Sequence, residues 1–166
     1  VLRTWIYLDD ILAWYDVFNH ARNQKFAEFG LLAPQTAQVE NAEVIYLPAS
    51  TGIRGANSLG VSGVMDVFAV IPIANSIDIA PTAGLKQRSP YRYGSAFSRA
   101  MTLRQNGFSQ ILLSGTASID ESGKTVFLDD TKGQIEKTYD VVEALIQSEG
   151  GNLDNVTEAT VFLKNR

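Results

Sequence analysis

Several residue types that build active sites are missing or rare in this chain of 166 residues. There is no cysteine, which excludes disulfides, thiolate metal sites and a cysteine nucleophile. There is one histidine, His20, so a multi-histidine metal site or a Ser-His-Asp triad is difficult to build from this chain alone. We therefore expect no metal centre.

Long apolar runs and an excess of positive charge are missing as well. No apolar run approaches the roughly 18 residues that a membrane span requires, and the first residues lack the basic region and apolar core of a signal peptide. Acidic residues outnumber basic ones, 18 to 14, for a net charge of −4, whereas nucleic-acid binding needs a basic face. We predict a cytoplasmic protein with no membrane or nucleic-acid partner. Four arginines that lie close in sequence still leave a local basic patch open: Arg88, Arg92, Arg99 and Arg104.

The residues that are present suffice for a packed core, since 45% are apolar and 19% charged. Apolar stripes at helical spacing predict two helices, over 11–29 and 131–149. The second is expected to begin at a capping residue among 129–131 and to end before Gly150. Its predicted apolar face comprises Ile135, Tyr139, Val142, Leu145 and Ile146. Short runs rich in β-branched and aromatic residues predict strands at 4–8, 44–47, 64–73, 111–113, 125–128 and 159–163.

Two connections stand out by their turn-forming residues. Residues 48–63 are glycine-rich, but they lack the lysine of a P-loop and the spacing of a dinucleotide fingerprint. They are consistent either with turns and a bulge or with a backbone that cradles a ligand. Residues 75–90 are interpreted as a linker.

The stretch 91–130 is the predicted ligand site. A polar and aromatic loop, 91–99, precedes the apolar run 111–113, which stops at the small residues 114–118. A turn at 120–123 is then expected to join this run to the strand 125–128 in a hairpin. Small residues at the end of a buried strand leave room for another group to approach the backbone.

A similarity between the two ends of the chain suggests that it contains two half-units. The segment Ile6–Asp10 is similar to Val161–Asn165, and the chain opens with a strand followed by a helix and closes with a helix followed by a strand. We predict that residues 1–80 form the C-terminal part of one unit and 81–166 the N-terminal part of a second, within a longer tandem-domain protein. The absence of an initial Met is consistent with an excised or incompletely recorded chain. Incomplete units leave strand edges unpaired, so the chain is expected either to form a homo-oligomer or to pair its own two halves.

The half-units resemble reactive intermediate deaminase (YjgF-like) domains. The resemblance lies in Leu112–Ile119, in the helix that follows and in Val156–Asn165, while residues 2–73 look like the last third of another such domain. It implies an α+β fold in which helices pack on one face of a mixed β-sheet.

A closer resemblance is to the chorismatase family, whose members carry two such domains. The most specific blocks are Tyr93–Ala100 and Ser114–Ile119. Further matching segments are Arg3–Thr4–Trp5 with Tyr7–Leu8, Trp14–Tyr15 with Phe18–Asn19 and Arg22, and Pro48–Ile53. The resemblance implies hydrolysis of chorismate, a small dicarboxylate, to pyruvate and a hydroxylated cyclohexadiene or benzoate acid, without a metal or organic cofactor.

The resemblance also implies a substrate site. Arg99 is expected to hold a carboxylate, with Tyr93 and Ser95 as hydrogen-bond donors, while Thr116 and Ala117 line the ring pocket and Ala117 influences which product leaves. Weaker candidates from the glycine-rich loop are Thr51 and Arg54. The general-acid Glu of the family is expected beyond Arg166.

Two other functions stay open. One is a non-catalytic small-molecule-binding protein of the same superfamily. The other is the imine deaminase or endoribonuclease activity of that superfamily, against which two features argue. The deaminases carry an Arg after the Pro-Ala of the corresponding strand, whereas here Pro48 and Ala49 are followed by Ser50, and a hydroxyl does not replace a bidentate guanidinium. The acidic composition argues against an RNA enzyme.

Overall fold

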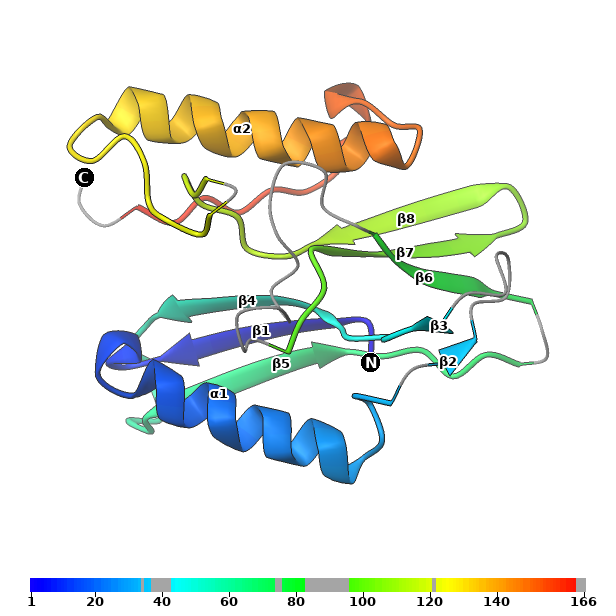
Figure 1. The fold of residues 1–166 in the computed structure, drawn as a ribbon, viewed down its shortest axis with the longest axis horizontal. Coiled ribbons are helices and arrows are strands. Elements are labelled where there is room, and N and C mark those ends of the chain that lie inside the picture. Colours follow the sequence, from blue (N-terminus) through cyan, green and yellow to red (C-terminus); the bar gives the residue numbers. More distant parts are fainter. Residues whose placement is uncertain (34, 37–42, 74–75, 83–95, 121, 164–166) are drawn as a thin grey trace.

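The computed structural model describes residues 1–33, 35–36, 43–73, 76–82, 96–120 and 122–163, and it has an α+β fold (Figure 1). The helices are α1 (Ile11–Glu28), α2 (Thr131–Ser148) and the short 3₁₀ helix η2 (Leu153–Asn155). The strands are β1 (Arg3–Leu8), β2 (Gln35–Thr36), β3 (Glu43–Val44), β4 (Ala49–Arg54), β5 (Gly63–Phe68), β6 (Asp78–Thr82), β7 (Ala100–Gln105) and β8 (Phe108–Leu113). No helix in these ranges is long and apolar enough to cross a membrane.

The first sheet has the strand order β4-β1-β5, in which β1 runs parallel to β4 and antiparallel to β5. The aromatic and β-branched residues of β1 favour this extended conformation, as predicted for 4–8. Helix α1, predicted at 11–29, covers one face of the sheet. A Cβ at Gly52 would lie 3.7 and 3.9 Å from side-chain atoms of Ile11 and Tyr15, which are ordinary contact distances, so α1 lies directly over β4 at this point.

The second sheet is antiparallel, with the order β6-β7-β8. Strands β7 and β8 form a hairpin closed by Asn106 and Gly107, which have φ values of 50° and 78°. Positive φ at both central residues is the signature of a type I′ turn, for which Asn-Gly is the preferred pair. The predicted hairpin between 111–113 and 125–128 is therefore wrong, because β8 pairs with the strand that precedes it.

The turn expected at 120–123 does form, although it joins no two strands. The Asp120 carboxylate accepts hydrogen bonds from the backbone N–H groups of Ser122 and Lys124 at 2.8 and 3.0 Å. Only one bridge, between Ile119 and Thr125, flanks this turn. Val126 extends this contact by one backbone hydrogen bond, from its N–H to the Ser118 carbonyl at 3.0 Å. The contact ends at Phe127, whose φ of 57° is incompatible with an extended strand.

The two sheets meet along the edge of β4. The Ser98 N–H donates to the Pro48 carbonyl at 3.0 Å, and the Gly115 N–H donates to the Ser50 carbonyl at 3.0 Å. The buried core beside this junction joins Leu2 and Ala49 of the first sheet region to Met101 and Leu103 of β7. In Figure 1, the order of elements is therefore α1, first sheet, second sheet, α2.

Helix α2 begins and ends as its sequence predicts. The Asp130 carboxylate accepts from the Gly133 N–H at 3.0 Å and so caps the N-terminus. At the C-terminus, Gly150 has a φ of 81° and the Gly151 N–H donates to the Ile146 carbonyl, as in a glycine-terminated helix.

The apolar face of α2 is only half covered. Leu145 and Ile146 are buried, whereas Ile135 and Tyr139 keep 44% and 54% of their surface exposed. The prediction that all five residues form an inward face therefore holds for the C-terminal half of the helix only.

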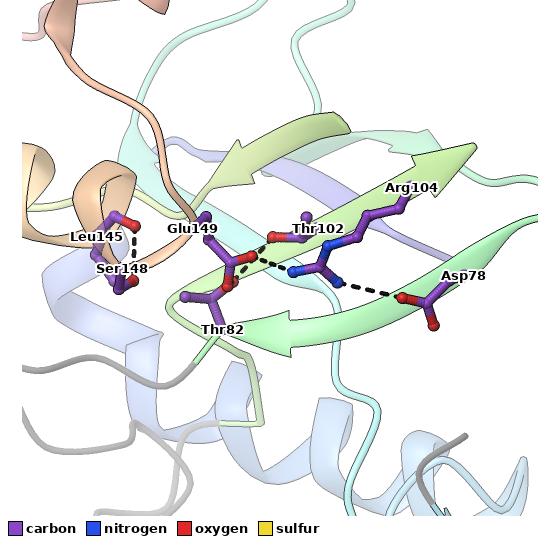
Figure 2. A network of polar contacts seen from close by, with 7 residues as sticks. All are labelled: Asp78, Thr82, Thr102, Arg104, Leu145, Ser148 and Glu149. Atoms are coloured by element: carbon purple, nitrogen blue, oxygen red, sulfur yellow. Dashed lines mark hydrogen bonds and ion pairs between the residues drawn. The ribbon is translucent and has the colours of Figure 1, made fainter. Parts of the chain in front are cut away.

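A polar network fixes the C-terminal end of α2 to the second sheet (Figure 2). The Glu149 carboxylate forms an ion pair with Arg104 of β7 and accepts from the Thr82 hydroxyl of β6 at 2.7 Å. Arg104 also pairs with Asp78 at 3.2 Å, and the Thr82 and Thr102 hydroxyls lie 3.0 Å apart. Three elements that are distant in sequence are thereby held together.

Several strand predictions need correction. The run 64–73 is strand only to Phe68, because Phe68 pairs with Arg3, the residue at which the antiparallel partner β1 begins. The run 44–47 contributes only Val44 to a strand, in a two-residue pairing with β2. The predicted strand 159–163 is not a strand, since these residues follow η2 without pairing to either sheet.

The two predicted connections contain strands. Residues 48–63 include β4, which is extended because it pairs with β1 along its whole length, from Arg3–Ala49 to Leu8–Arg54. Residues 75–90 include β6, which pairs with β7. In both cases pairing with a distant strand overrides the local preference of glycine and proline for turns.

Candidate functional site

A long open cleft lies where the two sheets meet. Strands β1 and β4 and helix α1 line one side of it, and β8, the segment that follows β8 and α2 line the other. Its volume of about 2280 Å³ exceeds the roughly 300–1,000 Å³ of ordinary small-molecule pockets. A small ligand would therefore occupy only part of the cleft. The positions of the polar and charged side chains identify that part.

Most of the sequence-predicted site residues that the structure describes line this cleft. Thr51 lies on β4, Arg99 immediately precedes β7, and Thr116 and Ala117 follow β8. The junction between the sheets brings these three segments together. Arg54 does not line the cleft: it ends β4, and its Nε donates to the Asp9 carbonyl at 3.0 Å in an exposed position. The two donors predicted upstream, Tyr93 and Ser95, lie outside the described residues.

The small residues after β8 allow close contact, as predicted, but the group that approaches them is β4. The Ser114 hydroxyl accepts from the Ser50 N–H at 2.8 Å and donates to the Ser98 carbonyl. A side chain at Gly115 would lie 3.0 Å from Cγ2 of Thr51, inside normal contact distance. Ser114 and Gly115 therefore serve the junction that forms the cleft floor.

Alternation along β4 separates two arms of the cleft. Thr51 contacts Gly115, whereas the neighbouring Gly52 faces Ile11 of α1, and successive side chains of a strand point to opposite faces. The Thr51 arm also contains Arg3, whose guanidinium donates to the Thr51 hydroxyl. The α1 arm lies on the other face, where Ser50 accepts a hydrogen bond from the Thr4 hydroxyl at 2.8 Å.

Arg3 is a buried cation in the Thr51 arm, with 6% of its surface exposed. It donates to Thr51 and to the Thr4 carbonyl at 3.1 Å, and its guanidinium lies 4.8 Å from the centre of the Trp5 ring. Among the described residues, no carboxylate lies within ion-pair distance of it. Burial lowers the pKa of Arg3 to about 10, against a smaller opposing effect of Tyr7.

The α1 arm contains a second cation, Arg22, which is half-buried. Its guanidinium lies 5.3 Å from the Phe18 ring and 5.8 Å from the Phe97 ring, and it donates to Oδ1 of Asn19 at 2.7 Å. Burial lowers the pKa of Arg22, and Tyr15 opposes this effect.

The predicted carboxylate-binding residue lies in the same arm. The guanidinium of Arg99 is 5.9 Å from the centre of the Phe97 ring, so a single phenyl ring lies next to Arg22 and Arg99 alike. Arg99 is itself buried, with 6% of its surface exposed. A cation over the face of an aromatic ring is attracted by the ring quadrupole, which partly replaces lost hydration.

Carboxyl groups along the cleft offer few candidates for acid catalysis among the described residues. Those that line it are Asp16, Glu149, Asp154 and Glu158. Glu149 is bound to Arg104 and Thr82, and the other three are exposed. Within the described ranges, no group of three His, Cys, Asp or Glu side chains could hold a metal ion.

Sequence reasoning assigned no site role to Arg3 or Arg22. The available signal was that both are charged residues at positions where an apolar side chain fits the pattern, Arg3 at the start of a strand and Arg22 within the inward stripe of α1. A charge in such a position is rarely buried without a partner.

No family model matches the chain, and no curated protein matches it.

Proposed function

We propose that this chain is part of a chorismatase-type enzyme with YjgF-like units, which hydrolyses chorismate to pyruvate and a hydroxylated cyclohexadiene or benzoate acid. One observation supports an anionic substrate above all. Arg3 is buried and Arg22 half-buried along the cleft, and no carboxylate of the described residues pairs with either. A buried charge normally has a partner, and a dicarboxylate supplies one.

The roles follow from the chemistry of the substrate. Chorismate is a dianion whose enolpyruvyl group is an enol ether. Protonation of the enol methylene and addition of water to the adjacent carbon give a hemiketal, which collapses to pyruvate and the ring alcohol. Cations that hold the carboxylates orient the enol ether toward the acid. We assign carboxylate binding to Arg99, and ring contacts to Thr116 and Ala117.

Three assignments come from the family resemblance alone. Tyr93 and Ser95 are proposed hydrogen-bond donors to the substrate, and the general acid is a Glu expected beyond Arg166. The two weaker candidates for substrate binding, Thr51 and Arg54, differ in their position relative to the cleft. Thr51 accepts a hydrogen bond from Arg3 at the cleft, so it belongs to the anion site, whereas Arg54 lies away from the cleft and receives no role.

The test is pyruvate release from chorismate by this chain and by the full open reading frame that contains it, with Arg99→Ala and Arg54→Ala compared in parallel. Arg54→Ala is the matched control, because it also removes one arginine but from an exposed position outside the cleft. We expect pyruvate from the full frame, a loss of at least tenfold in kcat/KM in Arg99→Ala, and no change in Arg54→Ala. The absence of pyruvate from a well-folded full-length sample contradicts the proposal.

A second candidate is a binding protein without catalysis. The observation in its favour is that buried cations line the cleft, whereas no buried carboxyl group of the described residues is available there as a general acid, because Glu149 is already paired with Arg104. In that case chorismate or another small carboxylate raises the melting temperature, this increase is lost in Arg99→Ala, and no pyruvate forms. The imine deaminase alternative gains no support. The Ser50 hydroxyl accepts a hydrogen bond from the Thr4 hydroxyl, and Ser50 lies on the junction between the sheets.

A further inference from the structure

The geometry of the α1 arm points to a specific role for Arg22: we propose that it binds one of the two carboxylates of the ligand, from the helix side of the cleft. This inference rests on the proposed function, because it takes the ligand to be a small dicarboxylate. It adds a second cation at a distance in sequence from Arg99, on a different secondary-structure element.

The first argument is the state of the Arg22 guanidinium. Its Nε is buried and has no hydrogen-bond acceptor among the described residues, and its one hydrogen bond goes to the neutral amide oxygen of Asn19. A guanidinium has five N–H donors arranged in a planar fork that suits a carboxylate. Arg22 therefore retains donor capacity that a carboxylate would fill.

The second argument is that the surroundings hold the guanidinium in place without neutralising it. Phe18 precedes Arg22 by one turn of α1, and Phe97 comes from the segment before β7, so the two rings fix the guanidinium from two elements. Aromatic rings orient a cation but bring no negative charge. Preorganised cations of this kind bind an anion with little further ordering.

The third argument is the relation between Arg22 and Arg99. Both lie within 6 Å of the Phe97 ring centre, at 5.8 and 5.9 Å, so the two guanidinium groups share one aromatic neighbour. Like charges around one ring repel each other, and an anion that binds beside them lowers this repulsion. A dianion offers one carboxylate to each of the two cations, whereas a monoanion has one carboxylate for both.

The experiment measures binding of chorismate and of benzoate, which has one carboxylate, to the wild-type chain and to Arg22→Gln, by isothermal titration calorimetry. If pyruvate forms during the titration, KM for chorismate replaces Kd. Lys25→Gln is the control, since it removes one cation from the exposed face of the same helix. We expect a rise of at least tenfold in Kd for chorismate in Arg22→Gln, a change below twofold for benzoate, and no change in the control.

Arg22→Lys separates charge from geometry. Lysine keeps the charge but loses the planar fork, so we expect its Kd for chorismate to fall between those of the wild type and Arg22→Gln. The melting temperature of each variant without ligand tests the alternative of a purely structural role. Loss of binding that is accompanied by a large fall in melting temperature in both variants overturns the inference, as does a Kd within twofold of the wild type.

The same samples distinguish this inference from the proposed function. Chorismate binding that depends on Arg22 without any pyruvate release refutes the enzyme and keeps the subsite. Pyruvate release with an unchanged KM in Arg22→Gln keeps the enzyme and refutes the subsite. If the wild-type chain and the full reading frame both fail to bind chorismate, both are refuted.

Discussion

Arg3→Met should make the protein more stable and a poorer anion binder. Methionine has a similar length and no charge, so it fills the space under Trp5 without requiring hydration. The reason to expect stabilisation is that Arg3 is a buried cation without a carboxylate partner among the described residues. Replacing a buried charge by an apolar side chain of similar volume is often neutral or stabilising.

The magnitude follows from the lowered pKa. An arginine ordinarily titrates above about 12, and Arg3 titrates at about 10, which corresponds to a penalty of about 3 kcal/mol on the charged form at about 1.4 kcal/mol per pH unit. The substitution removes the hydrogen bonds to Thr51 and to the Thr4 carbonyl, each worth about 1 kcal/mol. The net expectation is a gain of about 1 kcal/mol, or about 2–4 °C in melting temperature for a domain of this size.

The pH of the measurement follows from the sign of the effect. Because the pKa of Arg3 is lower in the folded state than in the unfolded chain, the unfolded chain binds more protons between the two values. The penalty is therefore complete below about pH 10 and disappears as the pH rises beyond the unfolded value. Thermal and urea unfolding at pH 8 measure it in full.

Ligand binding supplies the second half of this test. Chorismate should raise the melting temperature of the wild type more than that of Arg3→Met, because the variant lacks one cation of the cleft. Arg54→Met serves as the control and should stay within about 0.5 kcal/mol of the wild type in stability. A stability loss of more than about 1 kcal/mol in Arg3→Met, together with an unchanged response to chorismate, would refute the reasoning.

Three further substitutions test the fold around the cleft. Gly115→Val places methyl groups against Thr51, at a position where even a Cβ lies 3.0 Å away, so we expect a loss of about 1–3 kcal/mol in urea unfolding; a neutral result contradicts the close junction. Glu149→Ala leaves Arg104 without its less exposed partner, and we expect a loss of about 1.5–3 kcal/mol that is absent when Arg104 is replaced as well. Gly107→Ala forces a side chain into a positive φ of 78° and should slow refolding and destabilise the β7–β8 hairpin by about 1 kcal/mol, seen as faster amide exchange in these strands.

The parts of the fold that local sequence determines were predicted well. Both helices were predicted within one or two residues, because each carries its own start and stop signals: Asp130 caps α2, and Gly30 and Gly150 follow the last turns with positive φ. Strand β1 was predicted because its own aromatic and β-branched residues favour an extended chain. The α+β class, which the family resemblance implied, agrees with these elements.

The parts that depend on distant pairing were predicted poorly. Strand β4 lies in a glycine-rich stretch and becomes extended through pairing with β1, which no local pattern indicates. The β7–β8 hairpin is a different case, because Asn106-Gly107 is a strong hairpin signal. It was overlooked in favour of the Asp120 turn, which makes side-chain hydrogen bonds but joins no strands.

The candidate site shows the same division. A sequence motif was enough to propose Arg99, Thr116 and Ala117, which do line one cleft. The contact of Arg3 with Thr51 spans 48 positions and depends on the parallel register of β1 and β4. Arg22 meets Phe97 only because α1 and the segment before β7 lie on the same side of β4.

Net charge also conceals the character of the cleft. An excess of acidic residues argues against a broad basic face, yet the buried charged side chains beside β4 that the structure describes are positive, Arg3 and Arg99, and the half-buried Arg22 is positive as well. A surface charge in water contributes little, whereas a cation held away from water attracts an anion strongly. The position of a few arginines therefore says more about the ligand than the sum of all charges does. The burial of Arg3 without a carboxylate partner among the described residues lowers stability until an anion binds, so stability and anion binding should change in opposite directions when Arg3 is replaced.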